Sequence, residues 1–109
     1  MKKKILLVDD DKDFGLLFTN FFIGKDFEVL LAYNLRDGMV ALERERPQFI
    51  FMDNNLPDGR GWGKAGFILS EYPLTQLNLI SAWAAEKPAG NVRILEKPFC
   101  MTDLMSCLQ

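Results

Sequence analysis

The short apolar runs of this 109-residue chain end in polar side chains. Carboxylates follow the first and third runs, a hydroxyl follows the fourth and a lysine follows the fifth. In chain order these residues are Asp9, Asp10, Asp53, Ser81 and Lys97. Ligands of open α/β sheets bind beyond the carboxyl ends of the strands, so these side chains are expected to converge on one edge.

Three carboxylates at one edge repel one another unless a cation lies among them. Oxygen ligands favour Mg²⁺, which binds one or two carboxylates, keeps several waters and also accepts phosphate oxygens. A lysine and a hydroxyl beside such a metal are the groups needed to bind a phosphoryl group. The pattern therefore indicates phosphate chemistry on a carboxylate.

The composition excludes several other kinds of site. The chain has no histidine, which removes Ser/His and Cys/His catalytic pairs, histidine-containing zinc sites and a phosphohistidine carried by the chain itself. The net charge of −2 argues against a nucleic-acid binder that works through a broad basic field. The length and the hydrophobic share of 49% are typical of a single globular domain.

The remaining reactive side chains are two cysteines. Cys100 and Cys107 lie seven residues apart in a segment expected to be helical, too far apart to bridge each other. We interpret both as buried, reduced thiols. The apolar run Ile5–Val8 is too short for a signal peptide, and no stretch approaches the length of a membrane helix. We expect a soluble, cytoplasmic protein.

Five apolar runs alternate with longer amphipathic segments, which favours a doubly wound α/β fold. Three of the runs are nearly continuously apolar, as in strands buried on both faces of a parallel sheet. The predicted strands are Ile5–Val8, Phe27–Ala32, Phe49–Met52, Leu77–Ile80 and Val92–Leu95.

Helices are predicted between most of these strands. Asp11 is expected to be the N-cap of the first helix or a solvated acid in its first turn, rather than a third metal ligand. This helix ends near Gly24. The second begins at Asn34 as N-cap and stops before Pro47. Further helices are predicted over residues 61–72 and 101–108. The apolar stripe of the first helix consists of Phe14, Leu17, Phe18, Phe21 and Phe22.

The connection between the fourth and fifth strands is short. It contains ten residues, Ala82–Asn91, whereas a parallel crossover that includes a helix usually needs a dozen or more. We therefore expect the fourth helix to be shortened or absent.

Four motifs together resemble the receiver domain of two-component response regulators. They are Val8-Asp9-Asp10, Met52-Asp53-Asn54-Asn55-Leu56-Pro57-Asp58-Gly59, Ser81-Ala82 and Lys97-Pro98-Phe99. The resemblance covers essentially the whole chain, in order. It implies a single receiver domain over residues 1–109, with a flavodoxin-like five-stranded parallel sheet in the order 2-1-3-4-5.

The resemblance also implies roles for individual residues. Asp53 would be the phosphoacceptor. Lys97 would pair with that carboxylate at rest and with a phosphoryl oxygen afterwards, while Ser81 would hydrogen-bond a second phosphoryl oxygen. The implied Mg²⁺ ligands are Asp10 directly, Asp9 through the water shell of the metal, Asp53 and the backbone carbonyl of Asn55.

The function implied is that of a phosphoacceptor signalling domain that regulates a partner by changing conformation. Such a domain is regulatory rather than enzymatic, although it assists its own phosphorylation and dephosphorylation. The donor would be a sensor histidine kinase or a phosphotransfer protein. No direct contact with nucleic acid or membrane is expected, a homodimer is possible, and the sequence does not name the downstream target.

Departures from the family pattern leave alternatives open. Ile94 stands three residues before Lys97, where the family usually has an aromatic switch residue. Together with the short Ala82–Asn91 segment, this allows a pseudo-receiver that acts as a phosphorylation-independent interaction module. Trp83 either shields the phosphoryl group from water or fills the gap left by the missing helix. A haloacid dehalogenase-type phosphatase would need an aspartate where this chain has Asn55.

Overall fold

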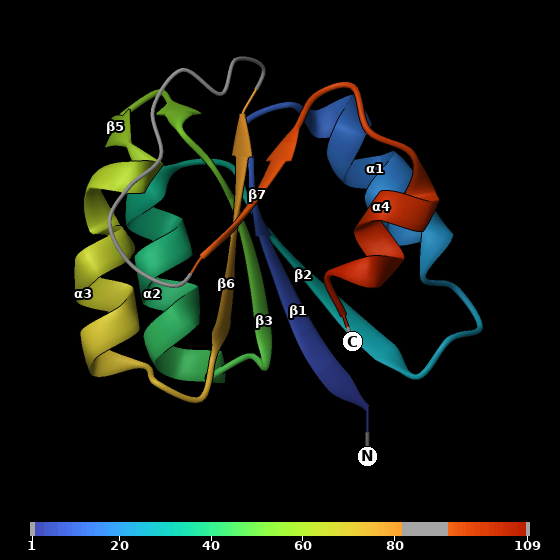
Figure 1. Ribbon diagram of the computed structural model, residues 1–109, viewed down its shortest axis with the longest axis horizontal. Helices are drawn as coiled ribbons and strands as arrows, with labels where there is room; N and C mark the ends of the chain where they lie inside the picture. The colour runs from blue at the N-terminus through green and yellow to red at the C-terminus, as the bar shows by residue number, and fades with distance from the viewer. Residues whose placement is uncertain (1, 82–91, 109) are drawn as a thin grey trace.

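The computed structural model describes residues 2–81 and 92–108, which form a parallel sheet between two layers of helices (Figure 1). The strand order is β2-β1-β3-β6-β7, and every pairing is parallel. This is the predicted order 2-1-3-4-5, so the predicted fold class is confirmed. The strands are β1 (Lys3–Val8), β2 (Phe27–Ala32), β3 (Phe49–Asp53), β6 (Gln76–Ser81) and β7 (Arg93–Glu96).

The helices cover both faces of the sheet (Figure 1). They are α1 (Lys12–Phe21), α2 (Leu35–Glu45), α3 (Ala65–Glu71) and α4 (Met101–Ser106), with the 3₁₀ turn η1 (Gly61–Lys64) directly before α3. Helices α2 and α3 lie on one face, and α1 and α4 lie on the other. None of the helices among the described residues is long and apolar enough to cross a membrane. The predictions for Trp83 and the fourth helix fall on 82–91, outside the described residues.

Side-chain caps fix where the first two long helices begin. The Asp11 side chain accepts a hydrogen bond from the Phe14 N–H, and the Asn34 side chain accepts one from the Asp37 N–H. The N-cap predicted at Asn34 is therefore confirmed, and of the two roles expected for Asp11 the structure shows the N-cap. Helix α2 ends at Glu45, and the left-handed backbone of its C-cap Arg46 (φ 48°) stops the helix just before Pro47.

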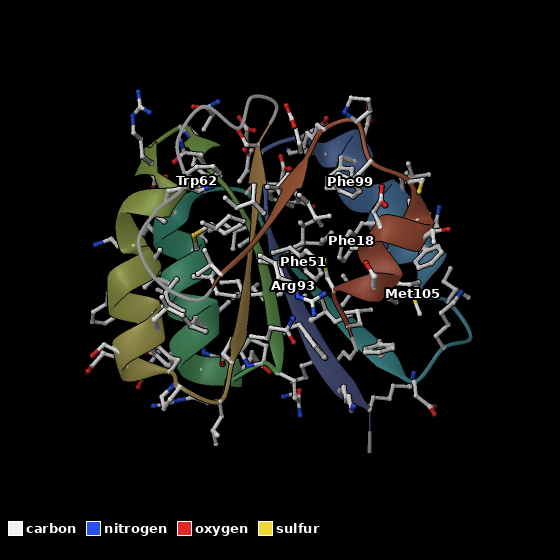
Figure 2. All side chains as sticks on the ribbon, in the orientation of Figure 1. Phe18, Phe51, Trp62, Arg93, Phe99 and Met105 are labelled. Carbon is white, nitrogen blue, oxygen red and sulfur yellow. The ribbon has the colours of Figure 1, made fainter. Side chains whose placement is uncertain are left out.

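The two faces of the sheet carry different cores. The core under α2 and α3 is mostly aliphatic, and Gly38 of α2 lies so close to β1 that a Cβ there would meet Val8 at 2.8 Å. The core under α1 and α4 is rich in aromatic rings. Phe18 and Phe51 meet there edge to face, with ring centroids 5.5 Å apart (Figure 2).

One residue of the predicted apolar stripe of α1 is not buried. Leu17 is 57% exposed, whereas Phe18 and Phe22 are buried against the sheet. The buried residues of α1 are Gly15 and Phe18, three apart, and Leu17 lies about 100° around the helix from Phe18. The apolar stripe of α1 is therefore wider than the face of α1 that the sheet covers.

The prediction of two buried thiols is also wrong for Cys100. Cys100 is exposed because α4 begins only after it, which places Cys100 at the N-cap, where its thiol contacts Asp103. Cys107 is buried, and its burial raises the pKa of the thiol. Both cysteines are free, as expected.

Candidate functional site

The carboxyl ends of β1 and β3 bring three carboxylates together. One oxygen atom from each of Asp9, Asp10 and Asp53 lies within 4.8 Å of the other two. These strands are neighbours in register, with Val8 opposite Met52, so the residues that follow them emerge side by side. Asp9 and Asp53 are buried, and Asp10 is exposed.

Lys97 reaches this cluster from the end of β7. Its Nζ donates a hydrogen bond to Asp9 Oδ2 at 3.0 Å and lies 3.8 Å from Asp53 Oδ2. The resemblance implied a resting pair with Asp53, but the ammonium lies closer to Asp9. A cis peptide joins Lys97 to Pro98, and the Lys97 N–H donates to the Ser81 carbonyl at 2.7 Å. Two buried carboxylates thus share one lysine.

The charge at this site is incompletely balanced. Burial raises the pKa of Asp53, the negative charge of Asp9 raises it further, and the positive charge of Lys97 opposes the rise. A second cation among the carboxylates would offset the burial and mutual repulsion of these negative charges. Three clustered carboxylate oxygens, one of them from an exposed side chain that leaves access for water, are a donor set that fits Mg²⁺.

The loop after β3 holds Asp53 through its neighbour Asn54. The Asn54 N–H donates to the Ile80 carbonyl, while its own carbonyl accepts from the Gly61 N–H at 3.0 Å. The Asn54 side chain accepts from the Trp62 N–H at 3.1 Å. These bonds fasten the end of β3 to β6 on one side and to η1 on the other.

Gly61 is required by this close approach. A Cβ at position 61 would lie 2.1 Å from the Asp53 carbonyl oxygen and 2.7 Å from Met52 Cγ. No side chain fits in that space. This role of Gly61 was not predicted from the sequence, because a glycine at the start of a predicted helix carries no local signal of what lies against it.

A small antiparallel hairpin, β4 (Asn55–Leu56) and β5 (Gly59–Arg60), follows the phosphoacceptor candidate. The Asn55 N–H donates to Asp53 Oδ1 at 3.3 Å, so Asn55 lies beside the carboxylate. At the tip, the Asp58 carboxylate accepts from the Leu35 and Arg36 N–H groups at 2.7 and 2.9 Å. Asp58 therefore caps α2, and these bonds lower its pKa.

The remaining predicted residues lie around the same edge. Ser81 is buried at the end of β6, opposite Glu96 of β7. Ile94 is half-buried and packs against the core under α2 and α3. Phe14 belongs to the predicted apolar stripe of α1, yet Lys97 Nζ lies 5.0 Å from the centre of its ring. Phe99 meets the same ring edge to face at 5.7 Å, on the α1 side of the sheet (Figure 2).

Residues 5–109 match the family of response regulator receiver domains. Proteins of this family are regulatory phosphoacceptors that bind Mg²⁺ at an acidic pocket. They interact with histidine kinases or phosphotransfer proteins and with downstream effectors. The curated relatives include the transcriptional regulatory protein DpiA of Escherichia coli K12, 36% identical over 59 residues. That alignment covers 52% of this chain and 26% of DpiA, about a quarter of the relative's length.

Solved receiver structures share the fold. The signal receiver domain of a putative Luxo repressor protein from Vibrio parahaemolyticus has a TM-score of 0.88 at 24% identity, covering 99% of this chain and 88% of that chain. A CheY-like receiver domain protein from Methanospirillum hungatei has the same TM-score and identity, covering 99% and 91%. The sequence match over residues 5–109 and the shared fold agree. The chain belongs to the receiver-domain family of two-component response regulators.

Proposed function

We propose that this receiver domain accepts a phosphoryl group on Asp53 in a Mg²⁺-dependent reaction and changes conformation to regulate a partner. The observation that carries the proposal is the position of Asp53. Its buried carboxylate lies beside Asp9 and Asp10, with the Lys97 ammonium 3.8 Å away. A carboxylate nucleophile, acidic ligands and a cation for a phosphoryl oxygen are the groups that the transfer requires.

In this reaction an oxygen of Asp53 attacks the phosphorus of the donor, and the bond from phosphorus to the donor nitrogen breaks. The donor imidazole keeps that electron pair, and the product is an acyl phosphate. Lys97 binds a phosphoryl oxygen, and the Ser81 hydroxyl donates to another. Asp9, Asp10, Asp53 and the Asn55 carbonyl would hold Mg²⁺, which neutralises charge on the transferred group.

The phosphoryl donor lies outside these 109 residues. They contain no histidine, so the phosphohistidine would be carried by a sensor histidine kinase or by a phosphotransfer protein. DpiA is described as a transcriptional regulatory protein, which supports a signalling role, although it aligns over only 26% of its length. The domain then acts as a regulatory phosphoacceptor rather than as an enzyme with a turnover of its own.

A phosphorylation-independent interaction module is not favoured. Such a module gains nothing from keeping two buried carboxylates beside one lysine, because desolvated charge without full compensation destabilises the fold. Ile94 lacks the ring and hydroxyl of the usual switch residue. The conformational change would therefore depend on Ser81 and Lys97, whose backbones are already joined at 2.7 Å.

The test is intact-mass analysis of the chain after incubation with Mg²⁺ and acetyl phosphate. We expect one added phosphoryl group in the parent, none in Asp53→Ala, and normal labelling in the control Asp26→Asn. Asp26 is an exposed carboxylate at the opposite end of the sheet, beside Lys3. If the parent binds Mg²⁺ yet gains no phosphoryl group from acetyl phosphate or from phosphohistidine donors, the proposal is wrong.

A further inference from the structure

Strand β2 has an open outer edge. Within the described residues β1 is its sole strand neighbour. The carbonyls of Asp26 and Ala32 accept from β1 residues and from Asp9 directly after β1, so alternate residues of β2 bond inward. By the alternation of a strand, the N–H and C=O groups that point outward are those of Phe27, Val29 and Leu31.

Exposed apolar side chains gather around this edge. Val40 of α2 is 49% exposed, and Tyr33 directly after β2 is 38% exposed. Leu16 of α1 is also exposed and lies one turn beyond Lys12, whose ammonium covers the Tyr33 ring. An unpaired strand edge flanked by apolar side chains is a surface suited to pairing with another strand.

A groove of about 600 Å³ runs along the edge between β2 and α2. Its walls include Val29 and Leu31 from the strand and Val40 from the helix. Charged groups lie at its two ends, with Asp37 in the first turn of α2 and Arg44 in the last. Glu45 also lines the Arg44 end, but it is paired with Lys4, so Arg44 leaves that end positive. Asp37 and Arg44 are both exposed.

We propose that the β2 edge is an interface for a second copy of this chain, with the two β2 strands paired antiparallel. The two-fold axis of such a pair is perpendicular to the sheet, so both α2 helices stay on the same face and run in opposite directions. Asp37 of one copy then lies beside Arg44 of the other, and the same contact occurs twice. A groove with opposite charges at its ends complements itself.

The spacing of the elements agrees with this arrangement. Helix α2 packs on both β1 and β2, so its axis lies over the space between them. Two such helices across a pair of edge strands would be about 10 Å apart, given a strand spacing of about 4.8 Å. That separation is within the usual packing distance of two helices, and it would bury Val40 of both copies between them.

A register centred on Leu30 also lets the outward backbone groups of the two β2 strands form hydrogen bonds. It places Val29 of one copy opposite Leu31 of the other, and both residues have outward backbone groups that can exchange hydrogen bonds. Glu28 then faces Ala32, so no two like charges lie directly opposite. This interface uses none of the acidic residues near Asp53 and is independent of the proposed function.

Sedimentation velocity of the unphosphorylated 109-residue chain, in EDTA and over a wide concentration range, tests this proposal. We expect a reversible dimer whose dissociation constant rises at least about tenfold in Val40→Lys. The matched control is Phe67→Lys on α3, where Phe67 is 50% exposed and lies outside the groove. That variant should dimerise like the parent, and circular dichroism should show both variants folded.

Exchanging the two charged residues tests the predicted contact between Asp37 of one copy and Arg44 of the other. Arg44→Asp alone should weaken the dimer, because it faces Asp37 of the other copy, and the double variant Asp37→Arg/Arg44→Asp should restore it. A chain that stays monomeric at every concentration overturns the proposal. So does a dimer that Val40→Lys leaves unchanged, since the two copies would then meet through another face.

Discussion

The two ends of the sheet differ in how their carboxylates are buried and paired with cations. At the carboxyl end, Asp9 and Asp53 are buried and share the single ammonium of Lys97. At the amino end, the carboxylates of Glu43 and Glu45 each have a partner of their own at the surface. Lys4 pairs with Glu45 at 2.9 Å, with both side chains about a third exposed.

The carboxyl pKa values shift in opposite directions at the two ends. Burial raises the pKa of Asp53, whereas the hydrogen bond from Lys4 lowers that of Glu45. The hydrogen bond from the Tyr72 hydroxyl likewise lowers the pKa of Glu43. Groups of the protein itself therefore compensate Glu43 and Glu45 at the amino end. The carboxyl end keeps negative charge that a further cation would compensate.

The largest effect is expected at Gly61. Gly61→Ala should lower the free energy of unfolding by about 3 kcal/mol, because the new Cβ would overlap the Asp53 carbonyl and displace the end of β3. Urea unfolding measures the change. Gly63→Ala is the matched control in the same 3₁₀ turn, where a Cβ meets nothing within 4 Å. Equal losses in the two variants would show that the close approach is not the cause.

The second-largest loss of stability is expected when the ammonium of Lys97 is removed. Lys97→Met leaves Asp9 and Asp53 facing each other without compensation, and we expect a loss of about 2 kcal/mol. The value is below that of a fully buried pair because the Lys97 side chain is 26% exposed. Mg²⁺ should recover part of the loss in thermal unfolding. A variant as stable as the parent in EDTA would contradict the charge imbalance.

Asp53→Asn is expected to change stability by a smaller amount and in the opposite direction, making the protein more stable. In EDTA at neutral pH, this variant should unfold about 4 °C higher than the parent, since it removes a buried charge next to Asp9. The raised pKa of Asp53 means that the folded parent binds a proton more readily than the unfolded chain. The advantage of the variant should therefore shrink as the pH falls from 7 towards the ordinary carboxyl value of 3.8. A constant or growing advantage would contradict this linkage.

The smallest effect is expected at the amino end. Lys4→Met removes the partner of Glu45, but exposed ion pairs contribute little to stability. Thermal unfolding should show no measurable change, in contrast to Lys97→Met. A loss as large as that of Lys97→Met would remove the distinction between the two ends of the sheet.

The fold could be predicted because apolar runs and caps are local signals. The strand Phe27–Ala32 was predicted with its observed bounds, and Asn34 was identified as a cap from its type and position. Asp9, Asp53 and Lys97 could be placed at one edge because each follows a strand, and parallel strands end on the same side of a sheet.

The missed features depend on contacts between distant parts of the chain. Gly61 matters because it meets the end of β3, and Asp58 matters because it caps a helix that begins 23 positions earlier. The exposure of Leu17 reflects how much of α1 the sheet covers. None of these follows from the spacing of residue types.

The most direct test of this account is the midpoint of thermal unfolding as a function of Mg²⁺ concentration. In the parent, Mg²⁺ should raise the midpoint progressively, because binding to the folded state alone adds stability. In Asp53→Asn the rise should be much smaller, since one of the three clustered carboxylates is lost. A parent whose midpoint does not respond to Mg²⁺ would contradict the claim that a cation completes the carboxyl end of the sheet.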